Sequence, residues 1–340
     1  MKVALGSKII NSAWGGGNNF VKNFSNFLLK RGVKVCYDLK DIDIDIILLT
    51  DPRVESSSST FNHYDIFTYL KKRPTTLVCH RINECDQRKG TNHVNDQLAL
   101  ANQFCDFTVF ISEWLRNIFI NKINKETYVI LNGANKKDFY FGSQKYEKGP
   151  IKIVTHHWSS HKNKGFDIYK LIDDGLNLNE YKNKIEFTII GNISKDYNFL
   201  NTKLIQPLHG KKLTDSLNSN HIYITGSINE PGGNHQNEAI NCGLPVLYFD
   251  SGCMKEYCEG YGQKYDKSNL FEKINDLKSQ QSFFRDKCKS YKFDSELMCN
   301  KYYSLFKKML DKKDYIVKNR QLPKISTIKK YSHLIRKIFI

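Results

Sequence analysis

The 340-residue chain lacks the long apolar segments that anchor proteins in membranes. None of its apolar runs approaches the roughly 20 residues that a helix needs to cross a bilayer. The first ten residues, MKVALGSKII, enter a strand-like segment and lack the apolar core and small-residue cleavage site of a signal peptide. We therefore expect a cytoplasmic protein.

Paired cysteine spacings are also missing, although the chain contains nine cysteines. They are scattered and form no C-x-x-C motif, whereas metal sites and disulfide frameworks need tighter, paired spacings. Several lie inside apolar strand-like segments, such as Cys36 in VKVCYD and Cys79 in TLVCH. This pattern indicates free thiols in a reducing compartment.

Acidic residues are scarce in the last forty residues, and this scarcity explains most of the net charge of +17. Residues 301–340 hold twelve lysines and arginines against two aspartates, which leaves only +7 to the other 300 residues. Basic and apolar residues alternate over 324–340, as in a helix that rests on anionic lipid. The segment 301–312 favours packing on the first domain, so we expect the tail to pack there or to touch a membrane rather than to bind nucleic acid.

No internal repeat at a solenoid period is present; instead, short apolar runs alternate with helix-length amphipathic stretches. Such alternation predicts an α/β fold with parallel sheets covered on both faces. We expect two doubly wound Rossmann-like domains, at 1–147 and 151–300, followed by a basic helix or tail at 301–340. The expected strands are residues 3–5, 33–37, 44–50, 76–80, 107–111, 128–131, 151–155, 185–190, 222–225 and 246–249.

The dinucleotide-binding fingerprint G-x-G-x-x-G is absent. The first strand leads into the run WGGG at 14–17, but Phe20 stands where the third glycine belongs. Glycines let a backbone approach a ligand closely, and a helix N-terminus presents free N–H groups to an anion. We expect Gly16 and Gly17 to contact such a ligand, the alternative being a tight turn. The spacing disfavours an NAD-dependent oxidoreductase, although Asp38 meets half of that fold's acidic requirement.

Two carboxylates follow the strand expected at 222–225. Glu230 lies in the loop after this strand, and Glu238 falls on the second turn of the next expected helix. They can face one crevice, with the backbone N–H groups of Gly232, Gly233 and Asn234 between them. A carboxylate accepts two hydrogen bonds from a vicinal diol. Glu238 therefore suits a ribose, and Glu230 suits the hydroxyl groups of a sugar.

Two glutamates with seven residues between them, followed by A-x-x-C-G-L-P-V, resemble the signature of glycosyltransferase family 4, the retaining GT-B enzymes. The resemblance implies two Rossmann-like domains facing across a cleft, the first for the acceptor and the second for a nucleotide-sugar donor. It also implies that Glu230 contacts the donor sugar, that Gly232 and Gly233 contact the sugar or phosphates, and that Glu238 binds the ribose. No cofactor is expected, because the nucleotide sugar is a substrate.

The segment THHWSSHKNKGFD at 155–167 resembles the family's R-x(4)-K-G-x-D, in which arginine and lysine neutralise the donor diphosphate. Lys164 takes the lysine position, but Ser159 stands where the arginine is expected. Lys162, or a histidine of this segment, is the candidate replacement. The structural alternative is a solvated lysine ahead of a helix.

His80 is a further catalytic candidate, because the family often places a histidine at the end of this strand, beside the donor sugar and phosphate. A dense polar run follows, in which we expect Arg81, Glu84 and Asp86 to face the acceptor. Arg81 stands where the family's usual partner acid would be, and a lone histidine is as often structural. The Asn-Gly pair at 132–133 resembles the family's turn before the interdomain linker and receives no catalytic role.

These residues predict a retaining transfer of a sugar from a nucleoside diphosphate sugar to an acceptor hydroxyl, in polysaccharide, lipid-linked glycan or glycoprotein synthesis. The leaving diphosphate needs cations and N–H donors rather than a strong base. Asp41, Asp43 and Asp45 alternate with isoleucine and indicate the solvent face of a strand rather than a D-x-D metal site, so we expect metal-independent transfer. Two alternatives remain, a sugar-nucleotide epimerase of similar fold and a nucleic-acid binder that uses the basic tail.

Overall fold

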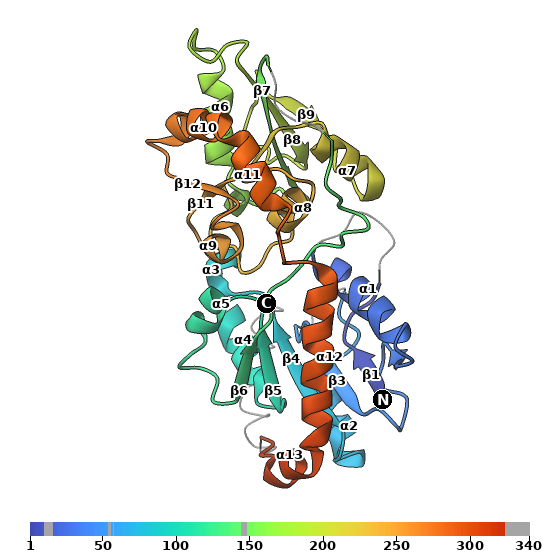
Figure 1. Ribbon diagram of the computed structural model, residues 1–340. Helices are drawn as coiled ribbons and strands as arrows, with labels where there is room; N and C mark the ends of the chain where they lie inside the picture. The colour runs from blue at the N-terminus through green and yellow to red at the C-terminus, as the bar shows by residue number, and fades with distance from the viewer. Residues whose placement is uncertain (10–15, 54–55, 57, 144–147, 324–340) are drawn as a thin grey trace.

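The computed structural model describes residues 1–9, 16–53, 56, 58–143 and 148–323. Figure 1 shows two α/β lobes, the first domain below and the second above, between which the chain crosses twice. The segment 324–340, for which membrane contact is expected, lies outside the described residues, as do Trp14 and Gly15. In the described part of the chain, no helix combines the length and the apolar character that crossing a bilayer requires.

The first domain is built on a parallel sheet whose inner strands are short, mostly buried and largely apolar. Its strands are β1 (Lys2–Leu5), β2 (Lys34–Cys36), β3 (Ile46–Leu49), β4 (Leu77–Ile82), β5 (Phe107–Phe110) and β6 (Glu126–Val129). They lie in the order β2-β1-β3-β4-β5-β6. Both faces of such a sheet need cover, which explains why its inner strands are largely apolar rather than alternating.

Helices cover both faces of this sheet. Those between its strands are α1 (Gly16–Leu29), α2 (His63–Lys72), α3 (Asp86–Lys89), α4 (Val94–Asn102) and α5 (Glu113–Ile118). The phenylalanine stripe of α1, with Phe20 and Phe24, packs on one face together with a helix from the far end of the chain. Helix α2 packs on the other face through Ile66 and Leu70.

The second domain repeats this architecture with a second parallel sheet. Its strands are β7 (Ile151–His157), β8 (Ile185–Gly191), β9 (Lys203–Ile205), β10 (Ile222–Thr225), β11 (Val246–Phe249) and β12 (Gly262–Tyr265). Its helices are η1 (Lys162–Lys164), α6 (Phe166–Gly175), α7 (Gly210–Asn218), α8 (His235–Asn241), α9 (Met254–Cys258), α10 (Leu270–Ser279) and α11 (Gln281–Cys288). The order β12-β11-β10-β7-β8-β9 confirms the predicted doubly wound α/β class.

This strand order creates a topological switch point. Strand β7 lies between β8, which follows it in sequence, and β10. The chain therefore leaves β7 and β10 toward opposite sides of the sheet, and a crevice opens beyond their carboxyl ends, where open α/β sheets bind ligands. The segments that follow these two strands carry Lys164 and Glu230.

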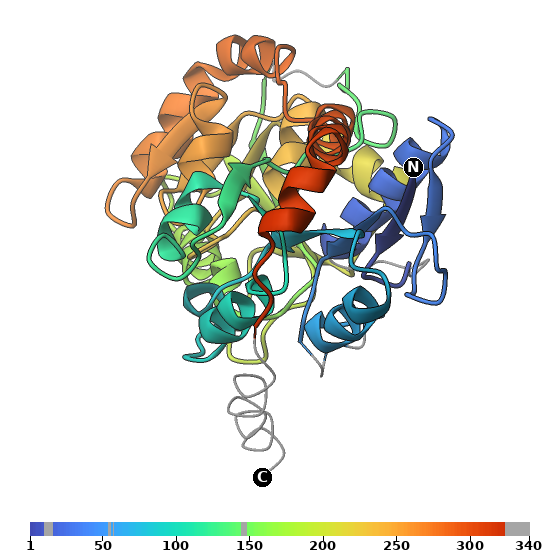
Figure 2. The same cartoon turned by 90° about the horizontal axis from the view of Figure 1, so that it is seen from below.

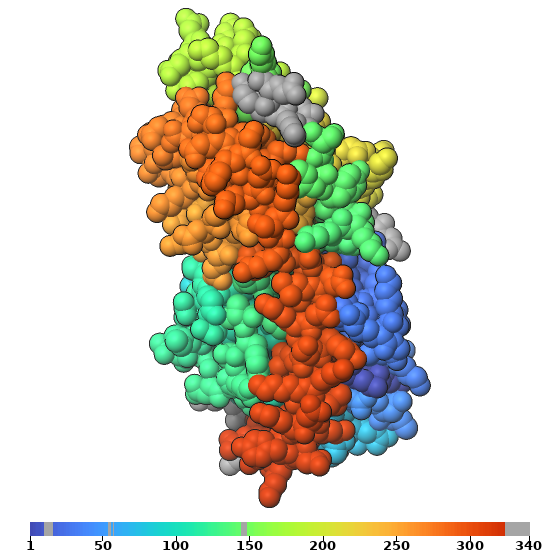
Figure 3. Space-filling model, in the orientation of Figure 1, coloured from blue at the N-terminus to red at the C-terminus, as the bar shows by residue number. Residues whose placement is uncertain are grey.

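The chain returns to the first domain through α12 (Ser295–Asp311), and α13 (Lys313–Asn319) follows it. The rings of Tyr302 and Phe306 of α12 pack at an angle against Phe24 of α1, so one face of this helix is part of the first core. Beyond α13, Arg320 forms an ion pair with Asp106, with Nη2 and Oδ2 2.7 Å apart. Figures 1 and 3 show this part of the chain, in orange-red, running along the first domain, and Figure 2 views α12 nearly end-on.

The two crossings run side by side. Ala134 on the first crossing forms a parallel bridge with Asp294 on the second, and the Ser295 N–H donates to the Ala134 carbonyl at 2.9 Å. A Cβ at Gly133 would collide with the backbone of Asp294, so this position needs glycine. The paired crossings form a narrow connection that sets how the two domains face each other.

Candidate active site

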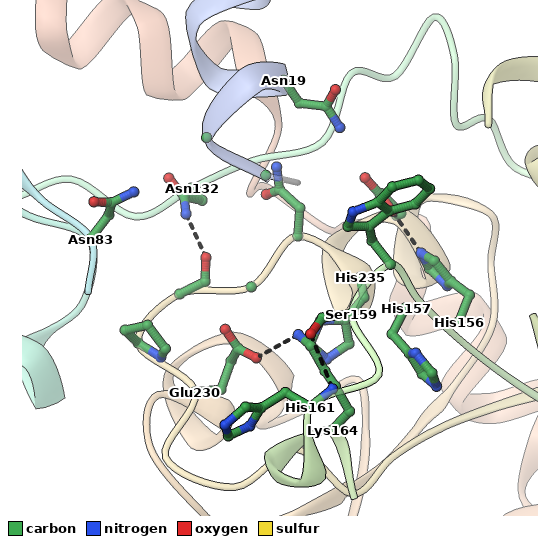
Figure 4. Close-up of a pocket in the computed structure, with 18 of the residues that line it drawn as sticks. Asn19, Asn83, Asn132, His156, His157, Ser159, His161, Lys164, Glu230 and His235 are labelled. Carbon is green, nitrogen blue, oxygen red and sulfur yellow. Dashed lines mark hydrogen bonds and ion pairs between the residues drawn. The ribbon is translucent and has the colours of Figure 1, made fainter. Parts of the chain in front are cut away.

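A cleft of about 460 Å³ lies between the domains and is lined by segments that follow strands of both sheets. Figure 4 shows its side chains, with Asn83 and Asn132 on one side and Lys164, Glu230 and a group of histidines on the other. The second-domain part of the cleft lies at the switch point between β7 and β10. This is where the sequence predicts the donor site.

Glu230 lies in the loop after β10 and is 5% exposed. Its backbone carbonyl accepts from the Cys253 N–H at 2.9 Å, which fixes the loop against the segment after β11. Its carboxylate Oε2 is 2.7 Å from Nη2 of Arg88 and 3.5 Å from Nζ of Lys164. Burial alone would raise the pKa of Glu230, but the charges of Lys164 and Arg88 lower it to about 2. The group is therefore a carboxylate at any ordinary pH.

Lys164 ends the short helix η1 after β7. The next residue, Gly165, has a φ of +94°, and a Cβ there would collide with the backbone of Gly226 after β10. This close approach brings the two strand-end segments together and places Lys164 beside Glu230. Burial lowers the pKa of Lys164, and the neighbouring carboxylate opposes this effect. Lys162, in the same turn, does not line the cleft.

Glu238 lies on α8 and also lines the cleft, 7% exposed. Its Oε2 is 2.7 Å from Nε2 of His156, at the end of β7. The structure thus brings both predicted carboxylates to one crevice, each beside a partner from the segment that begins with β7. Between them, Gly232, Gly233 and Asn234 line the cleft as well.

The glycines of this loop also have a packing role. A Cβ on Gly232 would lie 2.5 Å from Cδ1 of Ile111, which follows β5 in the first domain. Beside it, Oγ of Ser112 donates to the Pro231 carbonyl at 2.7 Å. A Cβ on Gly233 would meet the His235 ring. The loop that follows β10 therefore rests directly on the first domain, and Gly232 permits this contact.

The first domain contributes several predicted residues to the cleft. Gly16 and Gly17 line it at the start of α1, and a Cβ on Gly16 would meet no atom of the described residues outside its own helix backbone and chain neighbours within 4 Å. Arg81 and Glu84 line it too. Asp86 does not, because its carboxylate accepts from the backbone N–H groups at the start of α4.

His80 does not reach the cleft. Strand β4 runs on to Ile82, so His80 lies inside the strand instead of at its end, and its side chain is fully buried. Its Nδ1 lies 3.2 Å from Nδ2 of Asn102. Burial lowers the pKa of His80 to about 3, which keeps the ring neutral. The expectation of a strand-end histidine fails because two residues of β4, His80 and Arg81, are polar yet buried.

Arg88 is a cleft residue that the sequence analysis did not single out. It belongs to α3 in the first domain, yet its guanidinium contacts Glu230 in the second domain. Its Nη1 also donates to the backbone carbonyls of Asn163, at 2.7 Å, and Ile228, at 2.6 Å. The only feature of the sequence that pointed to Arg88 was its place in the dense polar run after β4.

Asn132 was interpreted only as a turn residue, but it joins both domains. Its Oδ1 accepts from Arg81 Nη2 at 2.9 Å, and its Nδ2 donates to the Gly232 carbonyl at 2.5 Å. Its backbone N–H donates to the Tyr257 hydroxyl at 2.8 Å, and its carbonyl accepts from Asn237. Asn132 thus holds the loop that follows β10 from the start of the interdomain connection (Figure 4).

No family model matches the chain, and no curated protein matches it in sequence. Solved structures match its fold. Sucrose-phosphate synthase from Thermosynechococcus elongatus superimposes with a TM-score of 0.64 at 12% identity, over 92% of this chain and 99% of that one. HepE from Anabaena, in complex with UDP-glucose, gives 0.65 at 12% identity, over 91% of this chain and 100% of the other.

WaaG, a glycosyltransferase of lipopolysaccharide biosynthesis, gives a TM-score of 0.64 at 12% identity, over 90% of this chain and 99% of that one. The chain has the GT-B fold. At these identities the likeness establishes the fold alone. Within the described residues of this GT-B chain, no group of three or more His, Cys, Asp or Glu side chains is placed to hold a metal ion.

Proposed function

We propose that this GT-B chain is a retaining glycosyltransferase that uses a nucleoside diphosphate sugar as donor. The observation that carries the proposal is the Glu230 carboxylate, ionised and buried at the switch point beside Lys164. A carboxylate there accepts hydrogen bonds from sugar hydroxyls, while the adjacent ammonium group attracts a phosphate. One small region thus offers partners for both halves of a sugar phosphate.

The ribose is assigned to Glu238. His156 engages Oε2, and Oε1 has no hydrogen-bond partner among the residues that the structure describes. Next to it, the cleft wall becomes apolar, with Ile190, Leu208 and Leu213. A flat nucleobase suits such a wall, because burying its faces there removes apolar surface from water.

The chemical step follows from this arrangement. As the bond between the anomeric carbon and the diphosphate breaks, negative charge builds on the leaving oxygen, and Lys164 stabilises it. The acceptor hydroxyl attacks from the same face and passes its proton to the leaving phosphate, so the anomeric configuration is kept. Because lysine supplies the positive charge, we propose that the transfer needs no metal, and activity should survive EDTA.

Thermal stabilisation by a panel of nucleotide sugars tests the proposal. A ligand at 100 times its Kd stabilises the folded state by about 2.7 kcal/mol, which a melting curve resolves. We expect a donor to raise the Tm of the wild type and to have little effect on Glu238→Ala. If none of the UDP-, GDP-, ADP- or dTDP-sugars raises the wild-type Tm, the proposed function is wrong. Release of a free epimer without an acceptor would instead identify an epimerase.

A further inference from the structure

Arg88 crosses the cleft. It is 8% exposed, and each hydrogen bond of its guanidinium within the described chain ends on the second domain. A hydrogen bond also runs in the other direction, from Nδ2 of Asn163 to the Arg88 carbonyl at 2.9 Å. These contacts bind α3 to both strand-end segments of the switch point.

The charge at the donor site requires such a residue. Glu230 and Lys164 are 3.5 Å apart and carry opposite charges, so by themselves they present no net charge to an anion. A diphosphate leaving group gains negative charge as the bond breaks, and it needs a net positive environment. Adding the Arg88 guanidinium at 2.7 Å from Glu230 makes this group of three side chains net positive.

The candidates for a second cation in the segment that follows β7 are poorly placed. Lys162 lies outside the lining of the cleft. Burial and the charge of Lys164 lower the pKa of His157 to about 3, and burial also lowers the pKa of His161. His156 is engaged with Glu238. The arginine that the sequence lacks at position 159 therefore has no substitute in its own segment.

Arg88 has donors left for a ligand. A guanidinium carries five N–H groups, and three of those on Arg88 are used by Asn163, Ile228 and Glu230. The N–H on Nε and one on Nη2 have no partner among the described residues. Two such donors form the planar fork that binds phosphate oxygens in pairs.

We propose that Arg88 is the second cation for the donor diphosphate, supplied by the first domain in place of the arginine that is missing at Ser159. This inference rests on the proposed function. Lys164 and Glu230 belong to the second domain and Arg88 to the first, so the complete phosphate site exists only while the domains are closed. Closing of the two domains then brings the second cation to the leaving group. The donor is therefore protected from reaction while the domains are open.

Calorimetric titration tests this proposal with two ligands that differ only in their phosphates. The probes are the nucleoside diphosphate that the wild type binds, among UDP, GDP, ADP and dTDP, and the matching nucleoside. We expect Arg88→Ala to weaken diphosphate binding on the order of 10-fold or more and to leave nucleoside binding unchanged. Arg88→Lys should recover part of the loss, because it keeps the charge but not the fork.

Arg116→Ala is the matched control, because Arg116 is a first-domain arginine that forms an ion pair with Glu113 on its own helix. It should bind both probes as the wild type does. Wild-type diphosphate affinity in a folded Arg88→Ala protein, with its melting curve unchanged, overturns the inference.

Inorganic pyrophosphate separates this inference from the proposed function. If pyrophosphate binding depends on Arg88 but no nucleotide or nucleotide sugar binds, only the proposed function fails. If the wild type binds neither pyrophosphate nor any nucleoside diphosphate, both fail.

Discussion

The two faces of the cleft carry opposite charge. On the second-domain face, the carboxylates Glu230 and Glu238 outnumber one lysine, Lys164. On the first-domain face, three cations, Arg81, Arg88 and Lys89, stand against one carboxylate, Glu84. The face that bears the recognisable motif is thus the acidic one, and the face with little sequence signal supplies most of the positive charge.

This difference shows that the two domains contribute different chemical groups to the cleft. On the proposed function, the second domain offers carboxylates that accept hydrogen bonds from the hydroxyl groups of a sugar and a ribose, in a fixed spacing along one loop and one helix. The first domain offers cations and the packing surface on which that loop rests, through Ile111, Ser112 and Asn132. The groups of the second domain lie close together in the sequence, whereas those of the first domain lie far apart in it.

Lys164→Ala removes the only lysine of the acidic face among the described residues and should have the largest effect. We expect kcat/KM to fall on the order of 10²-fold or more, as for the loss of one preorganised charge-stabilising donor. Steady-state kinetics with the donor identified by the thermal panel measures this. The exposed Lys264 of β12 provides the control variant, Lys264→Ala. An unchanged rate for Lys164→Ala would mean that another cation carries the phosphate.

Gly232→Ala tests whether the acidic face really rests on the basic one. The new methyl group would lie 2.5 Å from Cδ1 of Ile111, and such overpacking costs about 1–3 kcal/mol. Urea unfolding should show this loss in the free energy of unfolding. The double variant Gly232→Ala/Ile111→Ala should lose less than the sum of the two single variants. Strict additivity would show that the two side chains do not meet.

Acid titration probes the ion pairs that join the faces. The pKa of Glu230 is about 2 in the folded chain against an ordinary value of 4.5, so the unfolded state binds its proton first as the pH falls. Its contribution to stability is complete above pH 4.5 and is lost progressively toward pH 2. Between pH 5 and pH 3 the wild type should lose roughly 2 kcal/mol more than Glu230→Gln in urea unfolding. Equal losses in both proteins would contradict the paired carboxylate.

The two glutamates should differ in kinetics. Glu238→Ala loses a ribose contact, so the donor KM should rise about 10-fold with a smaller change in kcat, since one hydrogen bond to a charged group is worth about 1.5–3 kcal/mol. Glu230→Ala should mainly lower kcat, because the proposed function places the reacting sugar against this carboxylate, which lies beside Lys164. Wild-type kinetics in both variants would remove the donor-site assignment.

Much of the fold could be predicted from the sequence, because buried central strands are continuous apolar runs. Strands β9 and β12 were missed, and both lie at the edges of the second sheet. An edge strand is only partly covered, and accordingly Lys203 and Leu204 of β9 are exposed. Strand β4 was predicted too short, because His80 and Arg81 are polar residues inside a buried strand.

The site was predictable where function depends on neighbours along the chain. Glu230, Gly232 and Glu238 lie within one loop and one helix, so their spacing along the chain indicates how they are arranged in the site. Arg88 and Asn132 act on residues about a hundred or more positions away. Nothing local distinguishes them from surface or turn residues, and only the packing of one domain on the other reveals their roles.

Helix α12 has a consequence for how the protein is made. It supplies Met298, Tyr302 and Phe306 to the first core, so that core stays incomplete until α12 has been synthesised. The second domain is continuous in sequence and can close its own core earlier. Domains usually fold in the order of their synthesis. Here we expect the reverse order. The second domain folds first, and the first domain completes its core only when α12 packs on it.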